Sequence, residues 1–386
     1  MITKNNKIFL IFTLFYIYFT IALFESSRGN FIPFFMEEFK INNAVISLIL
    51  SLNTLGNIIG SFFGGHFCEK YGHKTVYIIG SVTSTIAVLI SPFTANLFML
   101  GLFNFIFGIG RSFLAIGVDS MVPVLSIGFE SILMNITHFM YGAGSFAGQR
   151  AYGKMLSEAV PWRTIYLYLG IFFVVSVILT LFIKTPKIQV CKDNTFKRKD
   201  FYKNPMIYMF VIALTFGLIT EAIINTWFIS YMRSSFSLSP ADAASYASIF
   251  FLTFALGRLF GGFILNRIGN TTGLKLFLFL AFAFIIAGLQ LKQNGFMLIA
   301  VSGLFISITF PTFMVIINEV FNENSSFAIG LIVTISNILY VILFNITGAL
   351  NDLLGSYAAF YAAPASIICC ILMLTIITKK SKKVSL

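Results

Sequence analysis

Several charged side chains lie inside stretches of this sequence that are otherwise apolar, among them Glu25, Arg28, Arg111, Asp119 and Glu221. A charge inside hydrocarbon is costly, so each such residue either has a function or belongs to a buried ion pair. A buried carboxyl can hold or release a proton, whereas an arginine keeps its charge and needs an anion, carbonyl oxygens or water. These residues therefore indicate the movement of protons and small polar solutes.

The first two charges, Glu25 and Arg28, are three residues apart and share one helical face. Burial favours the neutral form of a carboxyl, and a neighbouring guanidinium favours the charged form. We predict that Glu25 exchanges a proton as a cavity opens and closes, with Arg28 contacting substrate. A salt bridge without further function explains the spacing equally well.

Arg111 lies near the middle of a later apolar stretch, and Asp119 lies two turns further toward the predicted cytoplasmic end. Because an arginine cannot shed its proton, we expect Arg111 to serve as a counter-ion or a substrate ligand. Asp119 either exchanges protons or pairs with a residue at the inner surface.

His138, Tyr141, Ser145 and Gln149 follow one another at steps of three, four and four residues. This spacing predicts a polar stripe on one helical face, and a polar stripe in a membrane must point into the protein. Its hydroxyl and amide groups suit a polyhydroxylated ligand. Asn337, on a separate predicted span, is a further candidate contact.

Two pairs of residues at i, i+4 spacing follow later in the chain, Glu221 with Asn225 and Trp227 with Tyr231. No basic residue lies within several turns of Glu221 along the sequence, and a buried carboxyl without such a neighbour is best kept protonated. Proton coupling requires that state, so Glu221 is a second candidate proton carrier. Trp227 either stacks on a sugar ring or anchors its helix at the membrane interface.

The elements that position these residues are membrane-spanning helices. The chain of 386 residues is 58% hydrophobic and 10% charged, with a mean hydropathy of +0.91. Apolar runs of about 20 residues, long enough to cross a bilayer, recur throughout, and barrel strands would be shorter and alternating. We predict an all-α membrane protein whose twelve helices run over 8–32, 44–66, 75–93, 97–122, 132–156, 163–184, 205–230, 241–265, 274–291, 296–318, 327–348 and 356–378.

The net charge of +12 has a topological explanation. Most basic residues fall in loops on one predicted side, which places both termini in the cytoplasm of a cell-membrane protein. The partners expected on this basis are the lipid bilayer, a small-molecule substrate and protons, and no nucleic acid. No phosphate-binding loop, nucleophile elbow or metal-ligand spacing is present, so we predict no cofactor, no metal and no enzymatic activity.

The chain divides into two halves. A polar, basic segment, Lys184 to Lys203, separates two sets of six predicted spans. We predict a first bundle over 1–184, a cytoplasmic linker over 185–204 and a second bundle over 205–386. A Gly-rich stretch of the first half, GSFFGGHFCEKYGHK from Gly60, returns 197 positions later as GRLFGGFILNRIG, which indicates duplication.

This repeated stretch resembles the loop signature of the major facilitator superfamily, which lies between the second and third helices of each half. The resemblance implies a twelve-helix, monomeric secondary transporter whose halves rock about a central cavity, with the loop stabilising one conformation. The residues that carry it are Gly65, Glu69, Lys70, Gly72 and Lys74 in the first copy and Gly262, Asn266, Arg267 and Gly269 in the second.

A finer resemblance is to the fucose permease-like sugar:proton symporters. It rests on MNITHFMYGAG from Met134, on Trp162-Arg163, on Gly217-x3-Glu221-x5-Trp227-x3-Tyr231 and on Phe310-Pro311-Thr312. It implies proton-coupled uptake of a small polar solute such as a monosaccharide or polyol. The proton carriers that we expect from their place inside apolar stretches are Glu25, Glu221 and Asp119.

Two other functions remain open. A drug or metabolite exporter of the same superfamily often has Gly-x8-Gly-x3-Gly-Pro on the fifth span, where this chain has Gly144-x3-Gly148-Gln149 without the proline. The drug susceptibility of a deletion strain would separate export from uptake. A membrane sensor that transports nothing would normally append a signalling domain.

Overall fold

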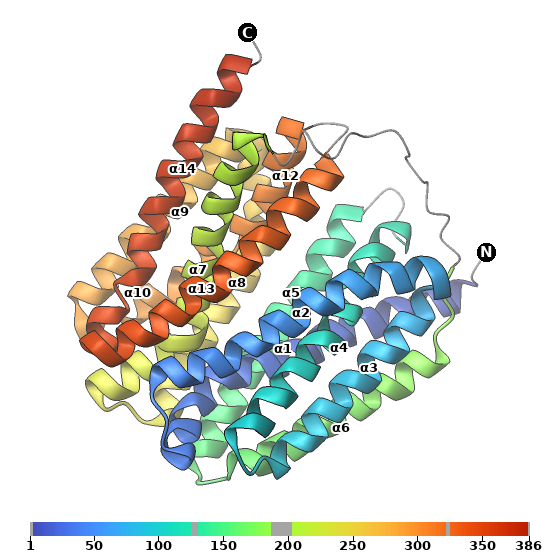
Figure 1. Cartoon of the computed structure of the whole chain (residues 1–386), viewed down its shortest axis with the longest axis vertical. Coiled ribbons are helices and arrows are strands. Elements are labelled where there is room, and N and C mark those ends of the chain that lie inside the picture. The colour runs from blue at the N-terminus through green and yellow to red at the C-terminus, as the bar shows by residue number, and fades with distance from the viewer. Residues whose placement is uncertain (1–2, 126–129, 187–202, 322–324, 385–386) are drawn as a thin grey trace. The chain divides into compact units, whose positions relative to one another are not determined.

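The computed structural model describes residues 3–125, 130–186, 203–321 and 325–384, which are helical apart from short connections. The chain forms two compact units (Figure 1). The first comprises Met1–Cys191 with Ser239–Ser248, and the second comprises Lys192–Leu238 with Ile249–Leu386.

In the first unit, α2 packs along α4, α1 packs along α5, and α3 contacts both α4 and α6. The α1–α5 and α1–α4 contacts matter most here, because they bring together the charged residues of three helices. The helices of this unit are α1 (Lys4–Phe39), α2 (Asn43–Tyr71), α3 (His73–Ile90), α4 (Leu97–Leu125), α5 (Glu130–Ser157) and α6 (Trp162–Phe182), with a short 3-10 turn η1 (Ser91–Phe93).

In the second unit, α7 packs against α13 and α14, and α9 packs against α14. The elements are α7 (Pro205–Phe236), α8 (Pro240–Ile268), α9 (Asn270–Gln290), η3 (Lys292–Gly295), α10 (Phe296–Val301), α11 (Gly303–Ile306), α12 (Thr309–Phe321), α13 (Ser325–Ala359) and α14 (Ala362–Val384). The first residues of α8 belong to the first unit.

The helical architecture predicted from sequence is confirmed, with differences in the ends of the helices. Within the described residues, eleven helical segments are long and apolar enough to span a membrane, and α5, which carries the polar stripe, falls outside that group. Helix α1 continues through Pro33 and ends at Phe39, seven residues later than predicted. Helix α13 contains a kink at Gly355, where φ is 77°.

The predicted span 296–318 is broken into α10, α11 and α12. Pro311 has no backbone N–H, so the Ser307 carbonyl four residues earlier lacks its usual helical partner. The Nε of Arg258 donates to that carbonyl oxygen at 3.3 Å, and its guanidinium lies 4.6 Å from the centre of the Phe254 ring. Arg258 therefore has a structural role in the second unit.

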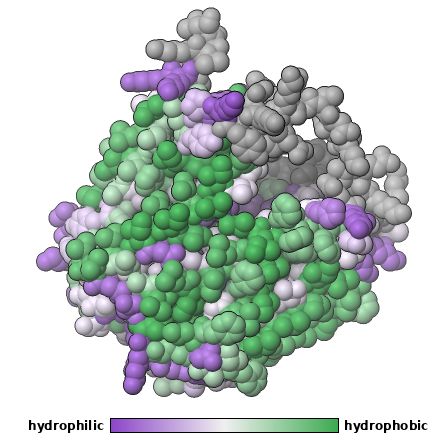
Figure 2. Space-filling view, in the orientation of Figure 1, coloured by the Kyte–Doolittle hydropathy of each residue, from purple (hydrophilic) through white to green (hydrophobic). Residues whose placement is uncertain are grey.

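The surface is strongly apolar, as Figure 2 shows for one face. Phe62, Phe98 and Leu353 are 79%, 76% and 80% exposed. Exposed apolar surface on this scale is unfavourable in water and favourable in lipid. The protein is therefore a multi-pass membrane protein.

The repeated glycines allow close helix packing in both units. A Cβ atom added at Gly60 would lie 2.7 Å from the carbonyl oxygen of Ile109 on α4. The equivalent Gly257 faces the carbonyl oxygen of Leu304 on α11 at similarly close range. Side chains larger than hydrogen would push these helix pairs apart.

The two signature glycines that follow behave differently. A Cβ atom at Gly65 or Gly262 would meet no described atom within 4 Å. Gly72 and Gly269, which join α2 to α3 and α8 to α9, have φ angles of 81° and 85°. With ψ angles of 163° and 144°, both positions require a backbone conformation that is nearly restricted to glycine.

Candidate functional site

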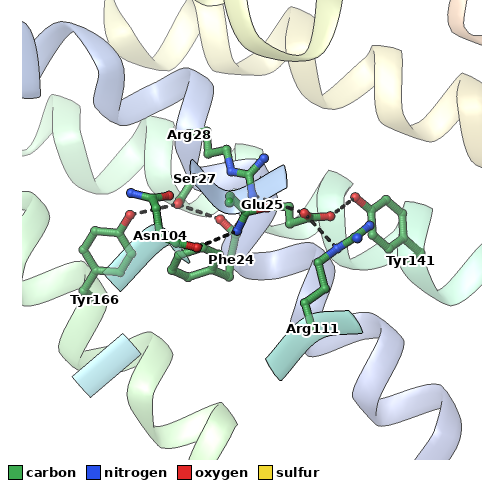
Figure 3. Close-up of polar contacts among 9 residues, drawn as sticks. Phe24, Glu25, Ser27, Arg28, Asn104, Arg111, Tyr141 and Tyr166 are labelled. Carbon is green, nitrogen blue, oxygen red and sulfur yellow. Dashed lines mark hydrogen bonds and ion pairs between the residues drawn. The ribbon is translucent and has the colours of Figure 1, made fainter. Parts of the chain in front are cut away.

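The centre of the first unit contains a buried ion cluster around Glu25 (Figure 3). Arg111 Nε lies 2.9 Å from Glu25 Oε1, and Arg28 Nη2 donates to the same oxygen at 3.2 Å. The Tyr141 hydroxyl donates to Glu25 Oε2 at 2.5 Å. Helices α1, α4 and α5 thus meet at a single carboxylate, which has both oxygens occupied.

The charges in this cluster do not balance. Two guanidinium groups face one carboxylate, so the cluster of Glu25, Arg28 and Arg111 carries one net positive charge when Glu25 is ionised. The Arg111 contact is a close ion pair whose N–H is not aligned for a hydrogen bond, and Arg28 Nε is buried without a hydrogen-bond partner among the described residues. Both arginines therefore keep donor capacity for another group.

Accessibility differs between the two kinds of charge. The Glu25 side chain is 9% exposed, whereas those of Arg28 and Arg111 are 20% and 25% exposed. The two arginine side chains thus have more accessible surface than the carboxylate between them, although the Nε atom of each is buried.

Neighbouring contacts hold α1 in place around the cluster. Ser27 Oγ donates to the Phe24 carbonyl oxygen at 2.7 Å and lies 3.4 Å from the Tyr166 hydroxyl on α6. The Phe24 ring stacks on Phe107 of α4 at 3.7 Å between centroids. These contacts fix the rotation of α1, and with it the direction of the Glu25 side chain.

Tyr18 joins the cluster to Asp119. Its hydroxyl donates a hydrogen bond to the Asp119 carboxylate, and its ring packs edge-on against His138 at 5.5 Å and near Tyr141 at 6.5 Å. Three predicted site residues thus surround a tyrosine that sequence reasoning missed. Tyr18 lies seven residues before Glu25, two helical turns along the same face, and that spacing is the signal that could have identified it.

The predicted stripe on α5 divides into two parts. His138 and Tyr141 are half-buried beside Tyr18, whereas Ser145 and Gln149 are 1% and 0% exposed. Asn30 of α1, a second residue missed from the sequence, donates from Nδ2 to Gln149 Oε1. The outer part of the stripe therefore serves as polar packing between α1 and α5 in this conformation.

The candidate aromatic residues of α7 lie in the core of the second unit. Trp227 is 1% exposed, donates from Nε1 to Thr347 Oγ1 at 3.0 Å and stacks on Phe344. Tyr231 is 0% exposed, and its ring stacks on Phe360 at 4.7 Å. This burial favours a packing role for both residues.

The remaining polar candidates are in the second unit as well. Glu221 and Asn225 on α7 and Asn337 on α13 are half-buried. They belong to a different unit from the Glu25 cluster, so their part in a shared site stays a prediction.

The loop after α2 and its repeat make equivalent contacts. His73 Nε2 lies 2.9 Å from Ser120 Oγ at the end of α4. Asn270, which is 197 positions after His73, donates from Nδ2 to Glu319 Oε1 of α12 at 2.6 Å. In each unit, the residue after the positive-φ glycine thus ties the loop to the helix beside it.

The charged positions of the predicted gating loop lie at the surface. Lys70 and Arg267 are exposed, with Lys70 Nζ 5.2 Å from the centre of its neighbouring tyrosine ring, and Lys74 is half-buried. The side chains of Glu69 and Asn266 lie outside the described part of the structure.

Comparison with known proteins agrees with this architecture. The chain is 20% identical to the cis,cis-muconate transport protein of Acinetobacter baylyi over 249 residues, which span 60% of this chain and 60% of that protein. It has the fold of the D-xylose-proton symporter, with a TM-score of 0.77, 12% identity and coverage of 96% and 97%. The E. coli fucose:proton symporter shares the fold with a TM-score of 0.68, 16% identity and coverage of 96% and 99%.

A family model provides the assignment. It matches residues 14–291 and 210–385, so both halves of the chain are covered. The chain belongs to the Major Facilitator Superfamily.

Proposed function

We propose that this transporter couples the uptake of a small polar solute to protons, with Glu25 as a coupling carboxylate. Members of the superfamily work by alternating access, in which two halves expose a central site first to one side and then to the other. The proposal includes a monomer, as the superfamily resemblance implies, in the cell membrane with cytoplasmic termini, as the distribution of basic residues predicts.

The single observation that carries the proposal is the contact of Glu25 with both Arg28 and Arg111. When ionised, Glu25 holds α1 and α4 together through Arg111, and α1 and α5 together through Tyr141. A proton on the carboxyl removes the attraction to the guanidinium groups. Protonation therefore changes both the contacts between helices and the donors available to a solute, which is what coupling requires.

The other acidic candidates take subsidiary roles in this proposal. Asp119 lies on the same helix as Arg111 and accepts a hydrogen bond from Tyr18, whose ring lies near Tyr141, and we propose that it exchanges protons in support of Glu25. Glu221 is the proton carrier proposed for the second unit.

Polar groups around the cluster define the substrates to test first. Arg28 and Arg111 supply guanidinium donors suited to hydroxyl and carbonyl oxygens, and the Tyr141 hydroxyl and the His138 ring are further polar groups close to Glu25 or Tyr18. Together with the fold shared with two sugar:proton symporters, they support monosaccharides and polyols as the first class.

The test uses purified protein reconstituted in vesicles, to which sugars, polyols and sugar acids are added in turn while the external pH is recorded. A transported solute should make the external medium more alkaline. The Glu25→Gln variant should lose this signal while still exchanging labelled solute. Glu158→Gln is the matched control, because it alters an exposed pair in which Lys154 Nζ and Glu158 Oε1 are 3.9 Å apart. Persistence of the alkalinisation in Glu25→Gln would rule out Glu25 as the coupling group.

A further inference from the structure

The two arginines of the cluster suggest what kind of solute it binds. Resting on the proposed function, we infer that the transported solute is an anion with a carboxylate group, which replaces Glu25 as the counter-ion of Arg28 and Arg111. This narrows the small polar solutes proposed above to acids, including sugar acids.

The first argument is the number of anions available. Among the described residues, Arg28 and Arg111 share one carboxylate, that of Glu25, as their ion-pair partner. The three-residue cluster therefore has one more positive than negative charge when Glu25 is ionised. A charge in a low-dielectric site is stabilised by a counter-ion far more than by neutral hydroxyl groups.

The second argument is the charge of the loaded site. With Glu25 ionised and no solute, the cluster carries one net positive charge. If Glu25 accepts a proton and a solute carboxylate binds, the net charge is again one positive. If Glu25 accepts a proton and a neutral sugar binds, it rises to two. Accumulating charge inside a membrane protein is unfavourable. Binding an anionic solute to the protonated site therefore costs less electrostatic free energy than binding a neutral sugar.

The third argument is geometric. A guanidinium carries five N–H donors in a planar fork that matches a carboxylate, and Glu25 occupies only part of each fork. Arg28 Nε is buried without a hydrogen-bond partner among the described residues, and the arginines are more exposed than Glu25. A solute carboxylate would then bind at the guanidinium N–H groups that protonated Glu25 no longer attracts.

The exchange balances in atoms and charge. One proton moves from water to a Glu25 oxygen, and one carboxylate moves from water to the guanidinium groups, with no covalent bond made to the solute. Release on the other side reverses both steps. Each cycle carries a proton and a monoanion together, so we expect transport of a monoacid to be electroneutral.

The experiment compares matched pairs of acids and neutral analogues by their thermal stabilisation of the purified protein: D-glucuronate with D-glucose, D-galacturonate with D-galactose, and D-gluconate with D-sorbitol. We expect an acid to bind at least about tenfold more tightly than its neutral analogue, the factor that corresponds to one charge-assisted hydrogen bond. Its affinity should rise as the pH falls, because Glu25 must be protonated. Arg111→Gln should remove most of this preference, and Glu158→Gln should keep it.

A second measurement does not depend on the natural solute. Glu25→Gln imitates the protonated carboxyl and leaves both guanidinium groups without their anion, so acetate or formate should stabilise this variant more than the wild type. Adding Arg111→Gln should abolish the effect. Sodium chloride at equal ionic strength controls for screening.

Two results would overturn the inference. The first is that the neutral analogues bind as tightly as the matched acids. The second is that added carboxylates raise the unfolding temperature of neither the wild type nor Glu25→Gln. Proton-coupled uptake of a neutral sugar would refute the inference and leave the proposed function standing. If the protein took up a carboxylate at a rate independent of the proton gradient, the proposed coupling would be refuted, and the inference that the solute is a carboxylate would stand.

Discussion

The two units share a packing framework and differ at their centres. Gly60 and Gly257 each let a helix approach its neighbour closely, and Gly72 and Gly269 adopt the same positive-φ conformation between helices. The first unit, however, contains the charges around Glu25 beside buried aromatic rings such as Phe24 and Phe107, whereas Trp227 on α7 of the second unit is surrounded by aromatic and apolar packing. The repeated glycines therefore predict how the helices pack, but they do not predict where the buried charged residues lie.

The ion cluster and the aromatic packing should respond differently to substitution. Charged groups can change partners on protonation, whereas tightly packed aromatic rings contribute mainly to stability. Substitutions in the aromatic core should therefore lower stability, whereas conservative substitutions in the ion cluster should change coupling.

The largest effect is expected for Trp227→Ala in the aromatic core. Removing a buried tryptophan side chain should lower the free energy of unfolding by about 3–5 kcal/mol, because a cavity remains where it packed on Phe344. Trp227→Phe should lose only about 1 kcal/mol, from the hydrogen bond to Thr347, and keep the wild-type affinity for solute. Thermal unfolding in detergent and binding assays measure these quantities. A large loss of affinity in a stable Trp227→Phe protein would instead place this residue at the substrate.

The next effect concerns the ion cluster. Glu25→Leu leaves two guanidinium groups without their anion and should lower the free energy of unfolding by about 3 kcal/mol. This value is at the lower end of the cost of breaking a buried ion pair, because the arginine side chains are partly exposed. Glu25→Gln preserves shape and hydrogen bonding and should cost less. Equal stabilities of the two variants would show that the cluster is not held together by charge.

Alanine at the repeated glycines tests whether the two frameworks are equivalent. Gly60→Ala and Gly257→Ala bring a methyl group against backbone atoms, and each should cost about 1–3 kcal/mol through overpacking. Gly65→Ala and Gly262→Ala face open space and should leave stability unchanged or raise it by up to ~1 kcal/mol through helix propensity. If the Gly65→Ala variant is stable, its transport rate compared with that of the wild type tests the predicted gating role of the loop. If only one member of each pair followed this pattern, the frameworks would not be equivalent.

Among the glycine substitutions expected to lower stability, those at the loop turns should have the smallest effect. Alanine at Gly72 or Gly269 must adopt a φ angle above 80°, which should cost about 1–2 kcal/mol at either position. The two costs should agree within experimental error. A marked difference in unfolding temperature would show that one of the two turns relaxes.

Much of the fold could be predicted from the sequence because each membrane helix is determined by a continuous run of its own apolar residues. Apolar runs set the spans, and the 197-residue repeat sets the equivalence of Gly72 and Gly269. The ends of the helices were harder to predict: Pro33 suggests a stop, yet α1 continues to Phe39, because a proline inside a membrane helix is tolerated where neighbouring groups satisfy the backbone.

The site was only partly accessible to sequence reasoning. The contact of Glu25 with Arg28 follows from their spacing. The contacts of Glu25 with Arg111 and Tyr141 join residues on three helices, and a helical period contains no information about which faces meet. For the same reason, the sequence could not show that Gln149 faces Asn30 or that Trp227 is enclosed in its unit.

The most direct test of Glu25 as the coupling group is proton uptake during solute binding, measured with a pH indicator in weakly buffered detergent solution. The solute is a sugar acid or a sugar that stabilises the protein. We expect the wild type to take up about one proton per solute bound and Glu25→Gln to take up none while still binding, because the Glu25 carboxylate takes a proton from the solution when the solute binds. Equal proton uptake by the two proteins would contradict this assignment.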